Sequence, residues 1–295
     1  MRLVTTAILL ALCFHASGQA ACPPDGKSRA ALSALKQDKW TVADDKQRQA
    51  DALALLDCLA DPDPFLRDEI AFEALFAWSR NKKLEPATLL SMMETLLARI
   101  NGPADAHGFG QPFAALALAE VARADYRGQP YLTPAQRVNL VNSAAAYLSG
   151  VRDYRGYEAG AGWRHGVAHA ADLMLQLSLN PAIERAQHET ILKAVAGQIA
   201  QSNHAYQFGE PERLMAPVFY LGARSALEAA DWDAWFAGVS ATPAGPAESM
   251  QAKLTRQHNV KAFLYALYAS LQESTNPVPK QKMLPAVVRA LKKMA

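Results

Sequence analysis

The sequence predicts an all-α fold of stacked antiparallel helical hairpins, an irregular α-solenoid with HEAT-like character. Apolar residues recur with the helical period of about 3.6 residues, and Pro, Gly, Asp and Asn separate these stretches. The chain lacks the sustained alternation and β-branched enrichment that are typical of strands. Because 51% of its 295 residues are hydrophobic, we expect one continuous core and a single helical-repeat domain over residues 21–295.

The first 20 residues have the pattern of a secretory signal peptide. Arg2 supplies the positive charge, residues 3–14 are apolar, and residues 17–20 offer small side chains for cleavage. The apolar run is shorter than the roughly 20 residues that span a bilayer, so we expect no transmembrane segment after cleavage near Ala21. The mature protein is then periplasmic or secreted. A lipid anchor at Cys22 ranks lower, because Gln19 stands where a lipoprotein signal has an aliphatic residue.

Charge and cysteine content narrow the classes of function. The formal net charge of +2 falls to +1 when Arg2 leaves with the signal, so the charge does not predict nucleic-acid binding. Cys22 and Cys58 remain in the mature chain and can pair in an oxidising compartment. A buried Cys58 with Cys22 free or lipidated is an equal alternative.

The first helix of the mature chain is predicted to run to about residue 59, with Thr41 as its N-cap and Asp44 as a weak capping-box acid. An Asp-Pro-Asp-Pro break follows, in which Asp63 suits an N-cap and Pro64 a first helical position. The next helix is predicted over residues 65–80. Prolines open most later helices, which we expect near 86–100, 112–124, 134–149, 163–179, 182–201, 212–229, 232–238, 253–272 and 285–294.

Residues 55–67 resemble the turn between the two helices of a HEAT repeat. In that turn an aspartate and an arginine six positions apart, here Asp61 and Arg67, tie the turn to the next helix. The resemblance covers about one hairpin and bears on the fold alone. No clean repeat period follows elsewhere in the chain.

A polar edge is predicted on the helix over residues 163–179. At 100° per residue, His165, His169, Asp172 and Gln176 fall within about 60° of one another. The opposite face is apolar and is expected to pack into the core; it consists of Trp163, Val167, Ala170, Leu173, Met174 and Leu177.

Two chemical interpretations of this polar edge stay open. His165, His169 and Asp172 can form a zinc-like site with an open position. A zincin protease is not predicted, because Gly166 follows the first His where zincins have Glu. Alternatively, the same side chains form a hydrogen-bonded network that holds neighbouring helices together.

The preceding loop, residues 152–162, contains three glycines that permit close backbone approach. Arg155, Tyr157 and Glu158 can bind an anionic or polar ligand at the start of the next helix. The alternative is a structural turn in which Arg152 and Arg155 pair with Asp153 and Glu158. Further along, Glu210 and Arg213 suit a helix N-terminus by charge, but a neighbouring hairpin can also place them beside the histidines.

Three motifs together resemble the DUF2785 family of bacterial proteins, whose function is unknown. They are Arg155-Gly156-Tyr157, Gly162-Trp163-x-His165-x-x-x-His169-x-x-Asp172 and Gly209-Glu210-x-x-Arg213-Leu214. Residues 109–118 are similar to the segment that precedes these motifs, and the resemblance spans about residues 50–240. It implies an α-helical fold and one shared site for His165, His169, Asp172, Glu210 and Arg213. Arg164 departs from the family pattern and adds charge beside the histidines.

The sequence favours an exported binding module with a polar ligand site on residues 153–176. The candidate ligand-binding residues are Arg155, Tyr157, Glu158, Trp163, His165, His169, Asp172, Glu210 and Arg213. The partner is a small molecule, a peptide or a protein. The alternative is an envelope hydrolase in which His165 and His169 bind zinc or act as acid and base. A Gly-x-Ser-x-Gly turn and a phosphate-binding loop are absent from the sequence.

Overall fold

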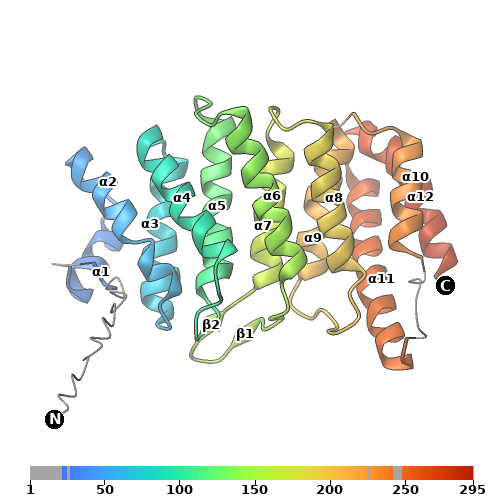
Figure 1. The fold of residues 1–295 in the computed structure, drawn as a ribbon, viewed down its shortest axis with the longest axis horizontal. Helices are drawn as coiled ribbons and strands as arrows, with labels where there is room; N and C mark the ends of the chain where they lie inside the picture. Colours follow the sequence, from blue (N-terminus) through green and yellow to red (C-terminus); the bar gives the residue numbers. More distant parts are fainter. Residues whose placement is uncertain (1–21, 25–26, 225, 242–247, 295) are drawn as a thin grey trace, which may run out of the picture.

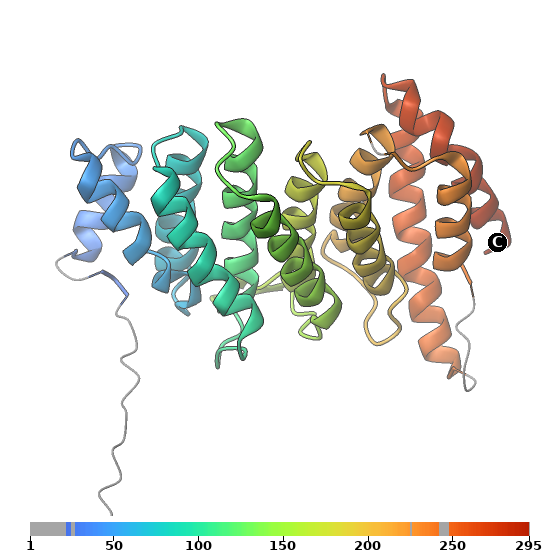
Figure 2. The same cartoon turned by 45° about the horizontal axis from the view of Figure 1, so that its top comes forward.

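The computed structural model describes residues 22–24, 27–224, 226–241 and 248–294, and it confirms the all-α prediction. The expected signal peptide and the residue after it lie outside these described residues. Helices follow one another along a single axis from the N-terminal to the C-terminal end (Figure 1). The turned view shows the same order of helices (Figure 2).

The helices form two layers. In one layer each helix packs against the next, and this layer consists of α3 (Glu73–Arg80), α5 (Gly110–Arg127), α7 (Gly166–Leu179), α9 (Glu210–Arg224) and α11 (Met250–Glu273). The other layer contains α2 (Asp45–Ala54), α4 (Pro86–Asn101), α6 (Pro134–Gly150) and α8 (Arg185–Ile199). The first helix is α1 (Arg29–Gln37), and the last pair, α10 (Ala229–Val239) and α12 (Pro277–Lys293), closes the stack.

Several predicted helix boundaries are confirmed and others are wrong. Pro86 and Pro134 begin α4 and α6, as expected for a residue without a backbone N–H. Asp44 rather than Thr41 caps α2, because its carboxylate accepts hydrogen bonds from the N–H groups of residues 46 and 47. Pro285 lies inside α12, which begins eight residues earlier at Pro277.

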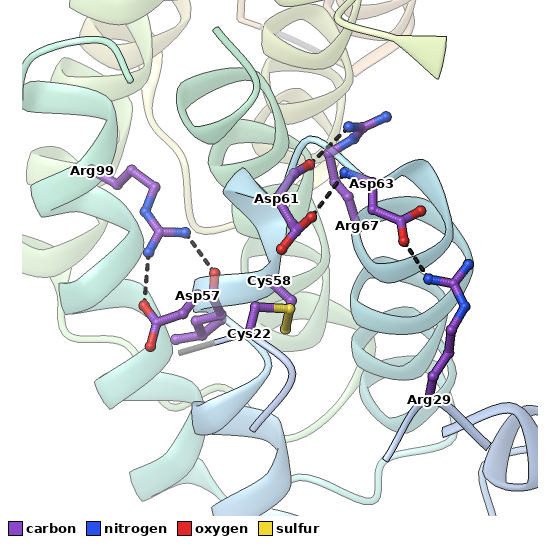
Figure 3. Close-up of a disulfide and its surroundings, with 9 residues drawn as sticks. Cys22, Arg29, Asp57, Cys58, Asp61, Asp63, Arg67 and Arg99 are labelled. Carbon is purple, nitrogen blue, oxygen red and sulfur yellow. Dashed lines mark hydrogen bonds and ion pairs between the residues drawn. A yellow bond between two sulfur atoms is a disulfide. The ribbon is translucent and has the colours of Figure 1, made fainter. Parts of the chain in front are cut away.

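The break before α3 holds its expected cap and an unexpected π-helix. Asp63 accepts a hydrogen bond from the N–H of Phe65 at 2.9 Å, and residues Phe65–Phe72 then form π-helical turns, labelled η2, that lead into α3. Arg67 and Asp61 do bond, as predicted, but the acceptor is the backbone carbonyl of Asp61, 2.9 Å from Nη1 (Figure 3). The wider assignment to HEAT repeats stays a prediction.

A continuous set of buried apolar side chains runs through the stack from Leu32 to Ala290. Trp232, Phe109, Phe236 and Phe263 are among the largest. Full burial of such a side chain contributes about 1.5–3 kcal/mol, so the core fixes the relative positions of neighbouring helices. Within the described ranges, the helices are all too short or too polar to cross a membrane.

Cys22 and Cys58 form a disulfide, with an S–S distance of 2.09 Å and a Cα–Cα distance of 5.1 Å (Figure 3). The bond ties the start of the described chain to η1, a 3-10 turn at Asp57–Ala60. Arg99 of α4 contacts the same turn through Asp57 and the carbonyl of Leu56. A lipid anchor on Cys22 needs the sulfur atom that this disulfide occupies, so the structure does not support that anchor.

Candidate functional site

A short β-hairpin precedes α7 where the sequence predicts only a loop. Strand β1 (Tyr157–Glu158) pairs antiparallel with β2 (Gly162–Trp163), and the hairpin lies at the lower edge of the stack in Figure 1. Gly160 and Gly162 both have φ +82°, a left-handed conformation that favours glycine. The glycines of this loop therefore make a tight turn.

The prediction that α7 begins at Trp163 is wrong. His165 adopts a left-handed conformation with φ 54°, so regular helix starts only at Gly166. Trp163 belongs to the hairpin and is 39% exposed, whereas the sequence placed it in the core. The last three predicted core residues of this helix, Leu173, Met174 and Leu177, are buried as expected.

Two buried arginines hold the hairpin against the stack. Arg67 is fully buried; its Nη2 donates to the carbonyl of Ala161 at 2.7 Å, and its guanidinium lies 3.7 Å from the centre of the Phe109 ring. Arg164 lies over the same ring at 4.4 Å and forms an ion pair with Glu158 of β1. Glu158 is therefore engaged within the hairpin, and Arg164 points to Phe109 rather than adding a free charge beside the histidines.

His169 is buried against α5 rather than exposed on a polar edge. It is 7% exposed, its ring meets the Phe113 ring edge-on at 5.0 Å, and it hydrogen-bonds the backbone of Pro112. Nδ1 has no hydrogen-bond partner in the described part of the chain. Burial, reinforced by the nearby His165 and Arg213, lowers the pKa of His169 to about 3, so the ring is neutral at physiological pH.

The other two helical residues of the predicted edge join α7 to both neighbours in its layer. Asp172 accepts from Nη1 of Arg213 on α9, with 2.6 Å between Oδ1 and Nη1. Gln176 accepts from the hydroxyl of Tyr126 on α5 at 2.7 Å. The polar edge therefore lies along the seams between helices, as the structural interpretation of this motif expects.

His165 and Glu210 meet at the backbone of Phe208. Nε2 of His165 lies 3.2 Å from the carbonyl of Phe208, and Oε2 of Glu210 accepts from its N–H at 2.8 Å. Glu210 is only 3% exposed. Burial lowers the pKa of His165, although the Glu210 charge and the Phe208 carbonyl oppose this shift. These two predicted site residues fix the loop that carries Phe208.

Four rings then form a partly exposed aromatic patch, which we define as Tyr157, Trp163, His165 and Phe208. The Trp163 ring lies 4.2 Å from His165, 5.1 Å from Tyr157 and 5.8 Å from Phe208, measured between ring centres. Tyr157 is 55% exposed and Phe208 is 37% exposed. Phe208 sits directly on Gly156, where an added Cβ would lie 2.0 Å from the ring. The sequence does not predict Phe208 as a site residue.

The donor set does not fit the predicted zinc site. Arg213 holds the Asp172 carboxylate, and Nε2 of His165 faces a backbone carbonyl. The described residues contain no group of three or more His, Cys, Asp or Glu side chains that could hold a metal ion. Asp172 and His165 are thus engaged by other groups of the protein.

The charged side chains of the loop next to the patch make contacts within the protein. Arg155 forms an ion pair with Asp153, and its hydrogen bonds hold the pKa of that carboxyl below its usual value. Arg152 donates instead to the carbonyls of Ser149 and Val151. The alternative of a structural turn is thus correct for Arg155 but not for Arg152.

A family model described as "Protein of unknown function (DUF2785)" matches residues 96–269, more than half of the 295-residue chain. The chain belongs to the DUF2785 family. The match includes the hairpin, the whole of α7 and α9, and most of α11, and it begins and ends later than the span of about 50–240 expected from the sequence. Arg67 lies outside the match, while the whole aromatic patch lies within it. No curated protein and no solved structure matches this DUF2785 chain.

Proposed function

We propose that this DUF2785 protein is an exported binding module whose ligand contacts the aromatic patch. The observation that carries the proposal is the contiguous exposure of Tyr157, Trp163 and Phe208 beside polar residues that are bonded within the protein. Exposed aromatic rings that are held rigidly bind partners well, because they offer a large contact area and lose little side-chain entropy.

The scaffold under the patch supports this proposal. Arg67 and Arg164 hold the hairpin against the stack, and His165 with Glu210 holds the loop around Phe208. A site whose rings are positioned before the ligand arrives avoids part of the ordering cost of binding. The candidate residues His169, Asp172 and Arg213 then act as positioning residues, while Trp163 and Tyr157 touch the ligand.

Export rests on the sequence and on the disulfide. The first 20 residues have the signal pattern, and a Cys22–Cys58 disulfide is typical of proteins in oxidising compartments. We propose a periplasmic or secreted location for the mature chain. Fractionation of cells that express the full chain tests this: protein that stays in the cytoplasm with residues 1–20 still attached would contradict it.

A hydrolase that uses His165 and His169 has less support. His169 is neutral and buried, and the nearest carboxylate on α7, Asp172, is engaged by Arg213. Only His165 is near the surface, where its Nε2 faces the Phe208 carbonyl. These contacts do not place an acid and a base on either side of a bond that could react.

Thermal-shift screening of the purified mature chain tests the binding proposal. A library of oligosaccharides, peptides and small metabolites is applied to the wild type, to Trp163→Ala and to Tyr265→Ala, an exposed aromatic residue on α11 that serves as the matched control. We expect a ligand that raises the Tm of the wild type and the control but not of Trp163→Ala. Ligands that act equally on all three chains would contradict a site at the patch.

A further inference from the structure

We infer that the ligand of this site is an uncharged oligosaccharide, whose sugar rings stack on the aromatic patch and whose hydroxyl groups enter an adjoining polar cavity. This inference rests on the proposed binding function and adds the chemical class of the ligand. Two observations carry it: the contacts within the protein that the charged side chains around the patch make, and the position and lining of the cavity.

The charges around the patch favour an uncharged ligand. Glu158 and Arg164 of the hairpin form an ion pair, and Asp153 with Arg155 forms a second pair. The buried carboxylate of Glu210 accepts from the N–H of Phe208. In the cavity, Arg152 donates to the backbone carbonyls of Ser149 and Val151, and Asp105 accepts from backbone N–H groups. A charged ligand would have to displace one of these internal contacts, whereas a neutral ligand leaves them intact.

A cavity of about 450 Å³ opens beside the segment that carries the hairpin, residues 154–165. Asp153 and Gly166 line it, and these residues bracket the segment 154–165. On that segment, Gly156 is covered by Phe208 of the patch, so the patch lies on the stretch of backbone whose two flanking residues line the cavity. The proposed ligand has several rings, so that one end stacks on the patch while the other passes around residues 154–165 into the cavity.

The cavity offers the groups that sugar hydroxyls need. Its polar lining residues are Asn101, Asp105, Gln111, Tyr147, Arg152 and Asp153. Gln111 donates through Nε2 to the carbonyl of Gly102, which leaves its amide oxygen as an acceptor. Burial, together with the Asp153 and Asp105 charges, raises the pKa of Tyr147, so its hydroxyl remains a donor. Amide, hydroxyl and carboxylate groups at hand match a ligand that is rich in hydroxyl groups.

A sugar ring explains patch and cavity together. Its C–H face stacks on an aromatic ring, and its edge carries hydroxyl groups that both donate and accept. A proline-rich peptide also binds exposed aromatic rings, but its side chains offer nothing to the polar cavity. The two observations together favour the oligosaccharide, and the peptide becomes an alternative outcome of the test.

Isothermal titration of the full mature, disulfide-bonded chain tests the inference. The probes are chitotetraose, cellotetraose and a proline-rich decapeptide, and the chains are the wild type, Trp163→Ala, Tyr147→Phe and the control Tyr265→Ala. We expect one tetrasaccharide to bind, with affinity lowered at least about tenfold by Trp163→Ala and about threefold or more by Tyr147→Phe, and unchanged in the control.

The other outcomes separate this inference from the proposed function. Peptide binding that is lost in Trp163→Ala, without tetrasaccharide binding, would overturn the ligand class and leave the binding function standing. Tetrasaccharide binding that responds to Trp163→Ala but not to Tyr147→Phe would overturn the role of the cavity. Absence of binding by all three probes would overturn the oligosaccharide inference. Binding that is unchanged in Trp163→Ala would overturn both the oligosaccharide inference and the proposed site at the patch.

Discussion

Arg213 on α9 places Nη1 2.6 Å from Oδ1 of Asp172 on α7, and this ion pair crosses the seam between two helices of the same layer. Burial raises the pKa of Asp172, while Arg213 opposes that shift. The Arg213 side chain is 50% exposed, whereas that of Asp172 is 19% exposed. It therefore belongs to the packing of the stack.

The first prediction concerns this pair. In a double-mutant cycle with Asp172→Ala and Arg213→Ala, we expect a coupling free energy of about 1 kcal/mol, because one partner is exposed and screened by solvent. Urea denaturation at low salt measures it, and about 1 M NaCl should reduce it. Additive effects of the two substitutions would show that the pair does not stabilise the seam.

A second prediction concerns pH. His169 is neutral in the fold, with a pKa of about 3, but it takes up a proton in the unfolded chain below its usual pKa of 6.5. The unfolded state therefore binds more protons between these values, and stability falls as pH falls. From pH 7 to pH 5 we expect this residue alone to cost about 2 kcal/mol.

The matched comparison uses His169→Phe, which cannot titrate beside Phe113, and His107→Ala, which removes an exposed imidazole. The stability of His169→Phe should fall less between pH 7 and pH 5 than that of the wild type. His107→Ala should keep the wild-type slope. Equal slopes in all three chains would mean that His169 is accessible to protons in the fold.

The third prediction tests how the patch is built. In Gly156→Ala the new methyl group meets the Phe208 ring, so the ring must swing away. We expect a small loss of stability, about 1 kcal/mol, and loss of any binding that depends on Trp163. Gly197→Ala on α8 is the control, because an added Cβ meets nothing within 4 Å there. The control should be neutral or stabilised by up to about 1 kcal/mol.

A fourth prediction concerns Arg67. In Arg67→Lys a single ammonium replaces three guanidinium nitrogens, which bond Asp68 and the carbonyls of Asp61 and Ala161. We expect a loss of about 2–3 kcal/mol and faster amide exchange in the hairpin. Arg289→Lys, on the exposed face of α12, should change stability by less than about 0.5 kcal/mol. Unchanged exchange in the hairpin would show that Arg67 does not anchor it.

Local chemistry explains which parts of the fold could be predicted from the sequence. Pro86 and Pro134 mark helix starts because proline suits the first turn, whatever the tertiary context. The two-residue strands of the hairpin are too short for a period-two pattern, and α1 (Arg29–Gln37) was not predicted at all. Thr41 and Asp44 are both good caps, and only the structure shows which one is used.

In the candidate site, too, some features follow from local sequence and others do not. Helical spacing correctly placed Asp172 and Gln176 on one edge of α7, but it could not show that Arg213 and Tyr126 would occupy them. The left-handed turn at His165, which exposes Trp163, is not encoded by any glycine at that position. Phe208 joins the site only through long-range packing on Gly156, so no local pattern indicates it.

The Cys22–Cys58 disulfide makes the two ends of the stack unequal. It links the chain before α1 covalently to η1, so the first helices cannot separate fully from η1. At the opposite end, α12 is held by noncovalent packing against α9, α10 and α11. In a stack where each helix contacts mainly its neighbours, opening spreads from the weaker end. When the protein is heated or pulled, we expect it to unfold first at its C-terminal helices and last at the disulfide-linked N-terminal turn.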